Sequence, residues 1–153
     1  MRLRALADHP EAFTSSHEED RRKPVAAMAA RLAPDADEAV YGAYAGDRLV
    51  ALAGLARETR MKNRHKATVF GMYVDPGFAG RGIGRALLAH VIAEARRQPG
   101  LLQLGLTVTD GNAAAAALYE HAGFRSFGVE PRAIGIDGKY YGKNHMILFL
   151  AQP

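Results

Sequence analysis

The sequence contains no cysteine and no tryptophan among its 153 residues. The lack of cysteine excludes disulfide bonds, thiol nucleophiles and cysteine-ligated metals. The six histidines never stand at the HxxxH or HExxH spacing that places two metal ligands on one helical face. No metal site is therefore predicted.

Long apolar runs are also absent. The N-terminus, MRLRALADHPEAFTSS, carries no stretch apolar enough for a signal peptide, and no later segment reaches the length of a membrane span. These absences predict a cytoplasmic protein that does not engage a membrane.

Charge is a weaker indication of partners. The formal net charge is +4 and the isoelectric point is near 9.6, which favours anionic partners. The basic residues are scattered without interleaved aromatic residues, so nucleic-acid binding is the weakest of the functions considered. With 48% hydrophobic and 24% charged residues, no repeat and no linker, the chain predicts a single domain over residues 1–153, with a homodimer left open.

Local patterns predict the helices and strands. Pro10 and Pro24 interrupt the first helix-forming segments, and Gly46–Asp47 marks a hairpin turn. SSHEED supplies a cap for the second helix, and Asp110 or Asn112 supplies one for the last. Helices are predicted at 4–14, 17–33, 83–97 and 112–123, a loop at 34–39, and strands at 39–45, 48–57, 67–74, 101–109, 124–130 and 140–150. The order α-α-β-β-β-α-β-α-β-β indicates an α/β domain built on one mixed sheet.

The third helix and the fourth strand have the clearest apolar faces, because their apolar residues recur every three to four and every two positions. The residues predicted to face the core are Ile83, Leu87, Leu88, Val91, Ile92 and Ala95 in the helix and Leu102, Leu104, Leu106 and Val108 in the strand.

The segment VDPGFAGRGIGRALL runs from a strand into a helix through Gly80, Gly82 and Gly84. Backbone N–H groups at a helix start have no intrahelical partner, and glycines let an anion approach them. Arg81 and Arg85 add charge-assisted donors. The dinucleotide fingerprint is excluded because its last glycine is Arg85 here, and a P-loop is excluded because Gly-Lys-Ser/Thr is absent. The segment indicates another phosphate-bearing ligand, or a tight turn beside two solvated arginines.

A second segment, NAAAAALYEHAGF, places Asn112, Ala115 or Ala116, and Tyr119 on one helical face. The alanines leave a smooth surface for a slender ligand, beside the amide of Asn112 and the phenol of Tyr119. An ordinary packed helix with a core tyrosine is the alternative.

Together these two segments closely resemble the GCN5-related N-acetyltransferase (GNAT) family, and RHKATVFGMYV and GVEPRAIGIDGKYY are similar to its small uncharacterised bacterial members. The resemblance, from about Ala39 to the C-terminus, implies a mixed, mostly antiparallel twisted sheet flanked by helices. It also implies acetyl-CoA-dependent transfer of an acetyl group to a primary amine of a small molecule or exposed peptide. The residues implied to bind the cofactor are Met72, Val74, Gly80, Arg81, Gly82, Ile83, Gly84, Arg85 and Asn112.

The resemblance also implies chemical roles. The backbone N–H of Met72 would stabilise the oxyanion, the backbone of Val74 would pair with the pantetheine amides, and Tyr119 would be the general acid for the leaving thiolate. Several family members use a glutamate base at a position that corresponds to about Thr107, which cannot accept a proton. The base is left unassigned among Glu58, His65, Tyr73 and Glu130, and the acceptor loop is placed near Glu130, Arg132, Tyr140 and Tyr141.

Two departures from the family pattern carry expectations. Ala79 stands where an arginine or glutamine usually begins the loop, which predicts a reduced cofactor affinity unless Arg81 or Arg85 compensates. The chain opens with MRLRALADHPEAF, which is similar to the family's first helix, so the strand that usually precedes it is expected to be missing. Ala79 and the unassigned base favour the alternative function, a non-catalytic coenzyme A-binding module.

Overall fold

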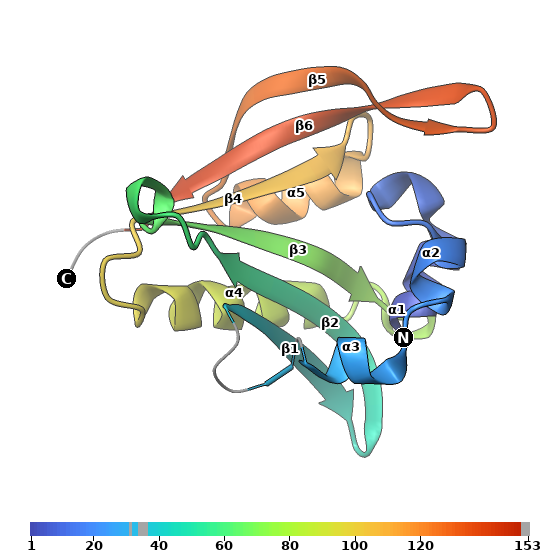
Figure 1. Cartoon of the computed structure of the whole chain (residues 1–153), viewed down its shortest axis with the longest axis horizontal. Helices are drawn as coiled ribbons and strands as arrows, with labels where there is room; N and C mark the ends of the chain where they lie inside the picture. Colours follow the sequence, from blue (N-terminus) through green and yellow to red (C-terminus); the bar gives the residue numbers. More distant parts are fainter. Residues whose placement is uncertain (31, 34–36, 151–153) are drawn as a thin grey trace.

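The computed structural model describes residues 1–30, 32–33 and 37–150. Its centre is a six-stranded sheet in the order β1-β2-β3-β4-β6-β5 (Figure 1). The strands are β1 (Glu38–Ala45), β2 (Arg48–Arg57), β3 (Lys66–Val74), β4 (Gln103–Thr109), β5 (Arg125–Ile136) and β6 (Lys139–Phe149). The helices are α1 (Arg2–Asp8), α2 (His17–Arg21), α3 (Val25–Ala30), α4 (Ile83–Arg96) and α5 (Ala113–His121), with 3-10 turns η1 (Pro10–Ala12), η2 (Met61–Asn63) and η3 (Pro76–Phe78).

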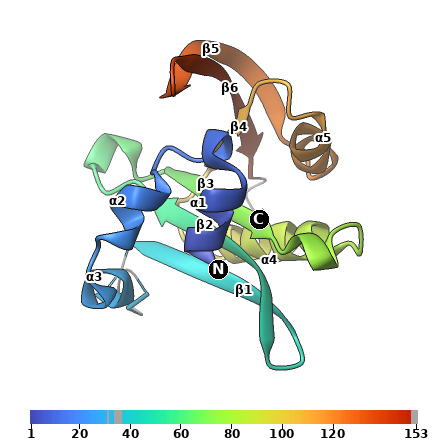
Figure 2. The ribbon, with the colours of Figure 1, turned by 90° about the vertical axis from the view of Figure 1, so that its right-hand side faces the viewer.

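Helices cover both faces of the sheet (Figure 2). On one face α4 packs against β1, β2 and β3, whereas α1 contacts β3 and η1 contacts β4 from the other. All neighbouring strands are antiparallel except β3 and β4. The predicted mixed, mostly antiparallel sheet flanked by helices is confirmed.

The parallel pair β3–β4 is short and then opens. Its ladder runs only from Lys66 opposite Gln103 to Thr68 opposite Gly105, and beyond it the two strands diverge (Figure 1). A gap between two strands of one sheet exposes strand edges that would otherwise be paired. This divergence places the candidate site.

A β-bulge lies on β3 just past that ladder. The register with β2 shifts between Leu52 and Gly54, so that Gly71 and Met72 together oppose Ala53. Gly71 has a φ of +63°, a backbone conformation that glycine adopts without strain. Because a bulge bends its strand and increases the local twist, it helps to turn the end of β3 away from β4.

The core lies between α4 and the sheet. All the predicted core-facing residues of α4 are buried except Ile83, which is half-buried. On β4, Leu104, Leu106 and Val108 are buried as predicted, but Leu102 is 39% exposed. Leu102 precedes the strand, after a turn in which the N–H of Leu101 donates to the carbonyl of Gln98, and Leu101 fills the core instead.

The N-terminal helices are shorter than predicted. The segment 4–14 forms α1 and η1, which meet at His9–Pro10, and the segment 17–33 forms α2 and α3, separated at Arg22–Pro24. Proline lacks an N–H and disfavours helical geometry in the residue before it, so both prolines divide the segments. Ser16 caps α2 from within the predicted capping segment, and it forms a capping box with Glu19. Residue 31 of the predicted helix and residues 34–36 of the predicted loop lie outside the described residues.

The last two strands form one long hairpin. The sequence predicted a polar loop between 130 and 140, whereas β5 continues to Ile136 and turns at Asp137–Gly138. These two residues have φ angles of +47° and +78°, as a two-residue type I′ turn requires.

None of the helices in the described ranges combines the length and the apolar composition that a membrane span requires.

Candidate functional site

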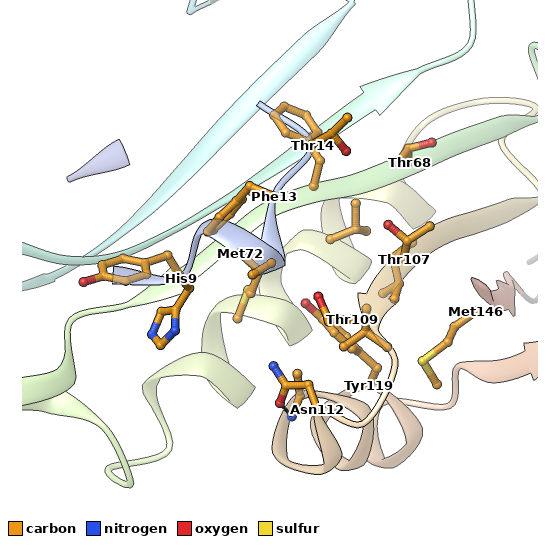
Figure 3. Close-up of a pocket in the computed structure, with 18 of the residues that line it drawn as sticks. His9, Phe13, Thr14, Thr68, Met72, Thr107, Thr109, Asn112, Tyr119 and Met146 are labelled. Atoms are coloured by element: carbon orange, nitrogen blue, oxygen red, sulfur yellow. Dashed lines mark hydrogen bonds between the residues drawn. The ribbon is translucent and has the colours of Figure 1, made fainter. Parts of the chain in front are cut away.

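A cleft of about 600 Å³ opens where β3 and β4 diverge (Figure 3). Met72 and Val74 line it from β3, and Asn112, Ala115 and Tyr119 line it from α5 and its N-cap. Four of the predicted site residues, from segments about forty positions apart, therefore share one cavity with the predicted smooth helical face. The helix at 112–123 is confirmed within two residues, as α5.

Asn112 is the N-cap of α5. Its side-chain Oδ1 accepts a hydrogen bond from the N–H of Ala115 at 3.1 Å. Capping residues of this type satisfy one of the free N–H groups at a helix start. The amide oxygen of Asn112 is thus engaged in the fold, which leaves the amide NH₂ as the group that a ligand in the cleft could use.

Tyr119 is buried, with 8% of its surface exposed. Its ring packs edge-on against Phe124, with centroids 6.0 Å apart. The hydroxyl makes no hydrogen bond to another described residue. In the described part of the chain, every fully buried side-chain oxygen or nitrogen has a hydrogen-bond partner, so the Tyr119 hydroxyl is not fully buried. The hydroxyl therefore keeps access to the cleft that Tyr119 lines. Burial raises the pKa of Tyr119 to about 12, so this phenol is protonated at neutral pH.

The glycine loop adjoins the same cleft. Gly80 and Gly82 have φ angles of +74° and +76°, and a Cβ added to either would meet nothing within 4 Å. Gly82 is the N-cap of α4, and no side chain caps this helix start. A Cβ on Gly84 would lie 3.4 Å from Val74 Cγ2 and 3.5 Å from Met72 Cε. Gly84 therefore brings the uncapped helix start against the two cleft residues of β3.

The two predicted arginines are exposed at the start of α4. The guanidinium of Arg81 lies 5.1 Å from the ring centroid of Phe78, and that of Arg48 lies 5.2 Å from the same ring. Cation–π contacts of this kind hold a cation in place at modest energy. Arg85 and the half-buried Ile83 occupy the first turn of the helix.

Asp75 anchors the glycine loop at its start. Its carboxylate accepts hydrogen bonds from Arg48 at 2.7 Å, from Arg4 at 3.0 Å and from the N–H of Gly77 at 3.0 Å. The Gly77 N–H and then the two arginines hold the pKa of Asp75 below its ordinary value. No local pattern in the sequence indicates this network, which ties α1, β2 and the glycine loop together.

The N-terminal segment covers part of the cleft, and the buried Lys143 fixes it there. Lys143 Nζ donates to the carbonyls of Glu11 and Ala12, both at 3.0 Å, and to Thr109 Oγ1 at 2.9 Å. Thr109 Oγ1 in turn donates to the carbonyl of Glu11 at 2.8 Å. Burial lowers the pKa of Lys143. Phe13 and Thr14, which follow this anchored turn, line the cleft (Figure 3).

The unassigned base candidates are placed very differently. Glu58 and His65 flank the start of β3, where the strands are still paired, and neither is among the described residues that line the cleft. Tyr73 lines it, but its hydroxyl donates to Asp8 at 2.7 Å. Burial, and then this hydrogen bond, raise the pKa of Tyr73 to about 12. Glu130 contacts His145, at 3.1 Å from Oε2 to Nε2.

The predicted acceptor-loop residues lie toward the tip of the β5–β6 hairpin. Arg132 stacks on Tyr140, with its guanidinium 5.6 Å from the ring centroid, and Tyr140 is 64% exposed. Neither they nor Tyr141 are among the described residues lining the cleft. Across the described ranges, no group of three or more acidic or histidine side chains is arranged to hold a metal ion.

Comparison with known proteins places this architecture. The model of the acetyltransferase (GNAT) family matches residues 3–124. Over 59 residues the chain is 51% identical to the [ribosomal protein bS18]-alanine N-acetyltransferase of Salmonella typhimurium, a segment that covers 39% of each chain. It is 38% identical over 97 residues to the N-alpha-acetyltransferase RimI of Mycobacterium tuberculosis, covering 63% of this chain and 58% of that one. The matches thus span less than two thirds of these relatives.

Solved structures share the fold over nearly the whole chain. A GCN5-related N-acetyltransferase from Kribbella flavida superposes with a TM-score of 0.80 at 24% identity, covering 97% of this chain and 87% of that one. The structure of yncA from Salmonella typhimurium, solved with its cofactor acetyl-CoA, has a TM-score of 0.76 at 22% identity, covering 97% and 86%. Because the family model matches well over half of this chain, the chain belongs to the acetyltransferase (GNAT) family.

Proposed function

We propose that this protein is a cytoplasmic, acetyl-CoA-dependent N-acetyltransferase that moves an acetyl group to a primary amine of a small molecule or an exposed peptide by direct attack. The observation that carries the proposal is the junction at Gly84. There an uncapped helix start, suited to a pyrophosphate, adjoins a cleft lined by Met72, Val74 and Tyr119.

The start of α4 supports binding of the donor. Its first N–H groups have no intrahelical acceptor and carry the positive end of the helix dipole. Gly80 and Gly82 leave open space in front of them, and Arg81 and Arg85 lie beside them. These are the features of a helix N-terminus that binds phosphate groups. Arg81, held on Phe78, is the residue that would offset Ala79.

The edge of β3 supports binding of the thioester. The N–H of Asp75 donates to the carbonyl of Val50 on β2 at 2.8 Å. Successive peptide groups of a strand point to opposite edges, so the N–H of Val74 faces the edge that diverges from β4. Met72 lies two residues earlier on the same strand, at the bulge. A backbone donor at this edge can stabilise the oxyanion that forms when an amine attacks the carbonyl carbon.

Tyr119 supports the departure of the thiolate. A phenol whose pKa is about 12 remains protonated throughout the working pH range. Its proton can pass to a thiolate as the C–S bond breaks, and the resulting phenolate can recover a proton from the new amide nitrogen. The hydroxyl's access to the cleft, without a competing hydrogen bond to described residues, suits this role.

A non-catalytic coenzyme A-binding module is the competing function. It is favoured by Ala79 and by Thr107, which lines the cleft at about the position where several family members use a glutamate base. Both functions require acetyl-CoA to bind, and only the enzyme releases thiol when amines are present. The curated relatives include acetyltransferases named for a protein alanine and for the small molecule streptothricin, so amines of both kinds belong in the screen. The homodimer remains a prediction.

Thermal shift measurements test the donor site. A ligand that binds only the folded state raises the melting temperature by mass action. We expect acetyl-CoA to stabilise the wild type and to lose this effect in Gly82→Val, whose side chain enters the open space before the helix. Gly46→Val is the matched control, since Gly46 has a φ of +58° and also meets nothing within 4 Å. Both variants carry the strain of a left-handed residue, but only Gly82→Val should lose the acetyl-CoA shift. Equal shifts in both would contradict the proposed site.

A further inference from the structure

A histidine and a carboxylate form a pair at the wall of the cleft. His145 Nε2 lies 3.1 Å from Glu130 Oε2. The imidazole also packs edge-on against Phe127, with centroids 5.9 Å apart. Both His145 and Phe127 line the cleft, and about a third of the His145 side chain, 35%, is exposed. The ring is therefore held by two neighbours while one part of it faces the cavity.

The pair lies beside the position where a base is missing. In the β4–β6 ladder His145 stands directly opposite Thr107. Residues that face each other across antiparallel strands project from the same side of the sheet as close neighbours. The imidazole of His145 thus stands next to the side chain of Thr107, which points into the cleft from β4 in Figure 3.

The contact with Glu130 sets which nitrogen is available. A carboxylate accepts hydrogen bonds, so it favours the tautomer that carries the proton on Nε2. Nδ1 is then the unprotonated nitrogen of the neutral ring. An imidazole oriented by a carboxylate through one nitrogen, with the other nitrogen free to accept a proton, is a common arrangement for a general base.

We propose that His145, oriented by Glu130, is the general base that prepares the acceptor amine, an inference that rests on the proposed acetyl transfer. His145 Nδ1 accepts one proton from the ammonium group, directly or through a water molecule. The neutral nitrogen then forms the C–N bond and the C–S bond breaks. Tyr119 protonates the thiolate and recovers a proton from the amide nitrogen, while His145 releases its proton to solvent. The products are the acetylated amine, the free thiol and one proton.

Other titratable or charged groups face the same cavity and could be confused with this base. His9 lines it too, with Nδ1 3.8 Å from Glu11 Oε1. His9 lies at the other side of the cleft from Thr107 in Figure 3, with Met72 between them. The groups on the elements packed around the cleft are Arg2, Asp8, His9 and Glu11 from the N-terminal segment, Tyr73 from β3, Tyr119 from α5, Glu130 from β5 and Lys143 from β6.

Thiol release from acetyl-CoA with the best acceptor of the wild type tests the assignment. His145→Gln keeps an N–H donor for Glu130 but removes Nδ1. Its kcat/KM should fall about 10²-fold at about pH 7, the usual effect of losing a general base. The loss should shrink at least about tenfold at about pH 9.5, because more of the amine is neutral without help. Tyr119, with a pKa of about 12, stays protonated there.

Three variants complete the experiment. Glu130→Gln, which removes only the orienting charge, should lose about tenfold at neutral pH and recover in the same way. Ser126→Ala, which removes the Ser126–Asn144 hydrogen bond from the same hairpin, should keep wild-type kinetics. His9→Gln should show no loss that recovers at high pH. Acetyl-CoA binding should be unchanged in all four variants.

The outcomes distinguish the assignment of His145 as the base from the proposed acetyl transfer on which it rests. If the wild type transfers acetyl groups but His145→Gln retains its activity, or loses it equally at both pH values, His145 is not the base and the proposed function stands. A loss in His9→Gln that recovers at high pH would assign the base to His9 instead. If the wild type itself turns over no amine, the acetyltransferase proposal fails and the base assignment fails with it.

Discussion

Replacing Tyr119 with phenylalanine separates the catalytic role of this residue from its place in the core. The ring is buried and packs against Phe124, so Tyr119→Phe keeps that packing and removes only a hydroxyl. The hydroxyl makes no hydrogen bond to other described residues. Its loss should therefore change the free energy of unfolding by less than about 1 kcal/mol, which is about 2–4 °C in melting temperature for a chain of this size.

The effect on turnover should be much larger. A general acid typically contributes about 10²–10⁴ in rate, so kcat should fall by that factor while acetyl-CoA binding is retained. Because burial raises the pKa of Tyr119 to about 12, the acid form is fully present below that pH. The ratio of wild-type to variant kcat should accordingly stay constant between about pH 6 and about pH 10.

The assay is thiol release and melting temperature measured on one preparation of each protein. Tyr119→Ala serves as the contrast, since truncating a buried aromatic ring costs about 3–5 kcal/mol and should lower stability as well as rate. A folded Tyr119→Phe protein with near-wild-type kcat, under conditions where the chemical step limits the rate, would refute the assigned role.

Three further outcomes follow from the fold. Gly54→Ala should destabilise by about 1–3 kcal/mol in urea unfolding, because its Cβ would clash with the ring of Phe70 and must displace it. Lys143→Met should cost about 1–3 kcal/mol and speed proteolysis within residues 1–16, because the anchored carbonyls lose their donor. The melting temperature should fall as pH rises from about 10 to about 12: Tyr73 and Tyr119 have pKa values raised to about 12, so the unfolded chain releases these protons first. Wild-type stability in either variant would contradict the corresponding contact. A melting temperature that stays constant between about pH 10 and about pH 12 would contradict the raised pKa values of the two tyrosines.

Local patterns were sufficient for the elements around the site. The apolar stripe of α4 and the alternation of β4 depend on side-chain periodicity. The structure buries the predicted stripe of α4 except for the half-buried Ile83, and the predicted face of β4 from Leu104 onward. Asn112 at the start of α5 and Ser16 at the start of α2 follow from capping chemistry that acts over three residues. The placement of these elements needed little information from the rest of the chain.

The end of β5 was missed although a local signal existed. Asp137–Gly138 is a dipeptide that favours a two-residue hairpin turn. The strands beside it are largely exposed and lack the alternation of apolar residues that marks a strand. Pro131 and two nearby glycines are residue types that are disfavoured inside strands.

The remaining site features depend on contacts between distant segments. Lys143 and Glu11 are 132 residues apart, and no pattern around either indicates that a buried ammonium anchors the N-terminal turn. The Glu130–His145 pair depends on a register that includes a shift between Ser126 and Gly128. The sequence was sufficient to propose Glu130 as a candidate base. Its partner His145 could not be predicted without the pairing of β5 and β6.

Amine-dependent thiol release from acetyl-CoA, with mass spectrometry of the acceptor, tests the central claim most directly. The wild type should release thiol in the presence of at least one primary amine from a panel of small molecules and peptides with free N-termini, and that amine should carry the acetyl group. The release should disappear without amine and fall about 10²–10⁴-fold in Tyr119→Phe. Acetyl-CoA binding without amine-dependent thiol release across the panel would contradict the account and identify the protein as a coenzyme A-binding module.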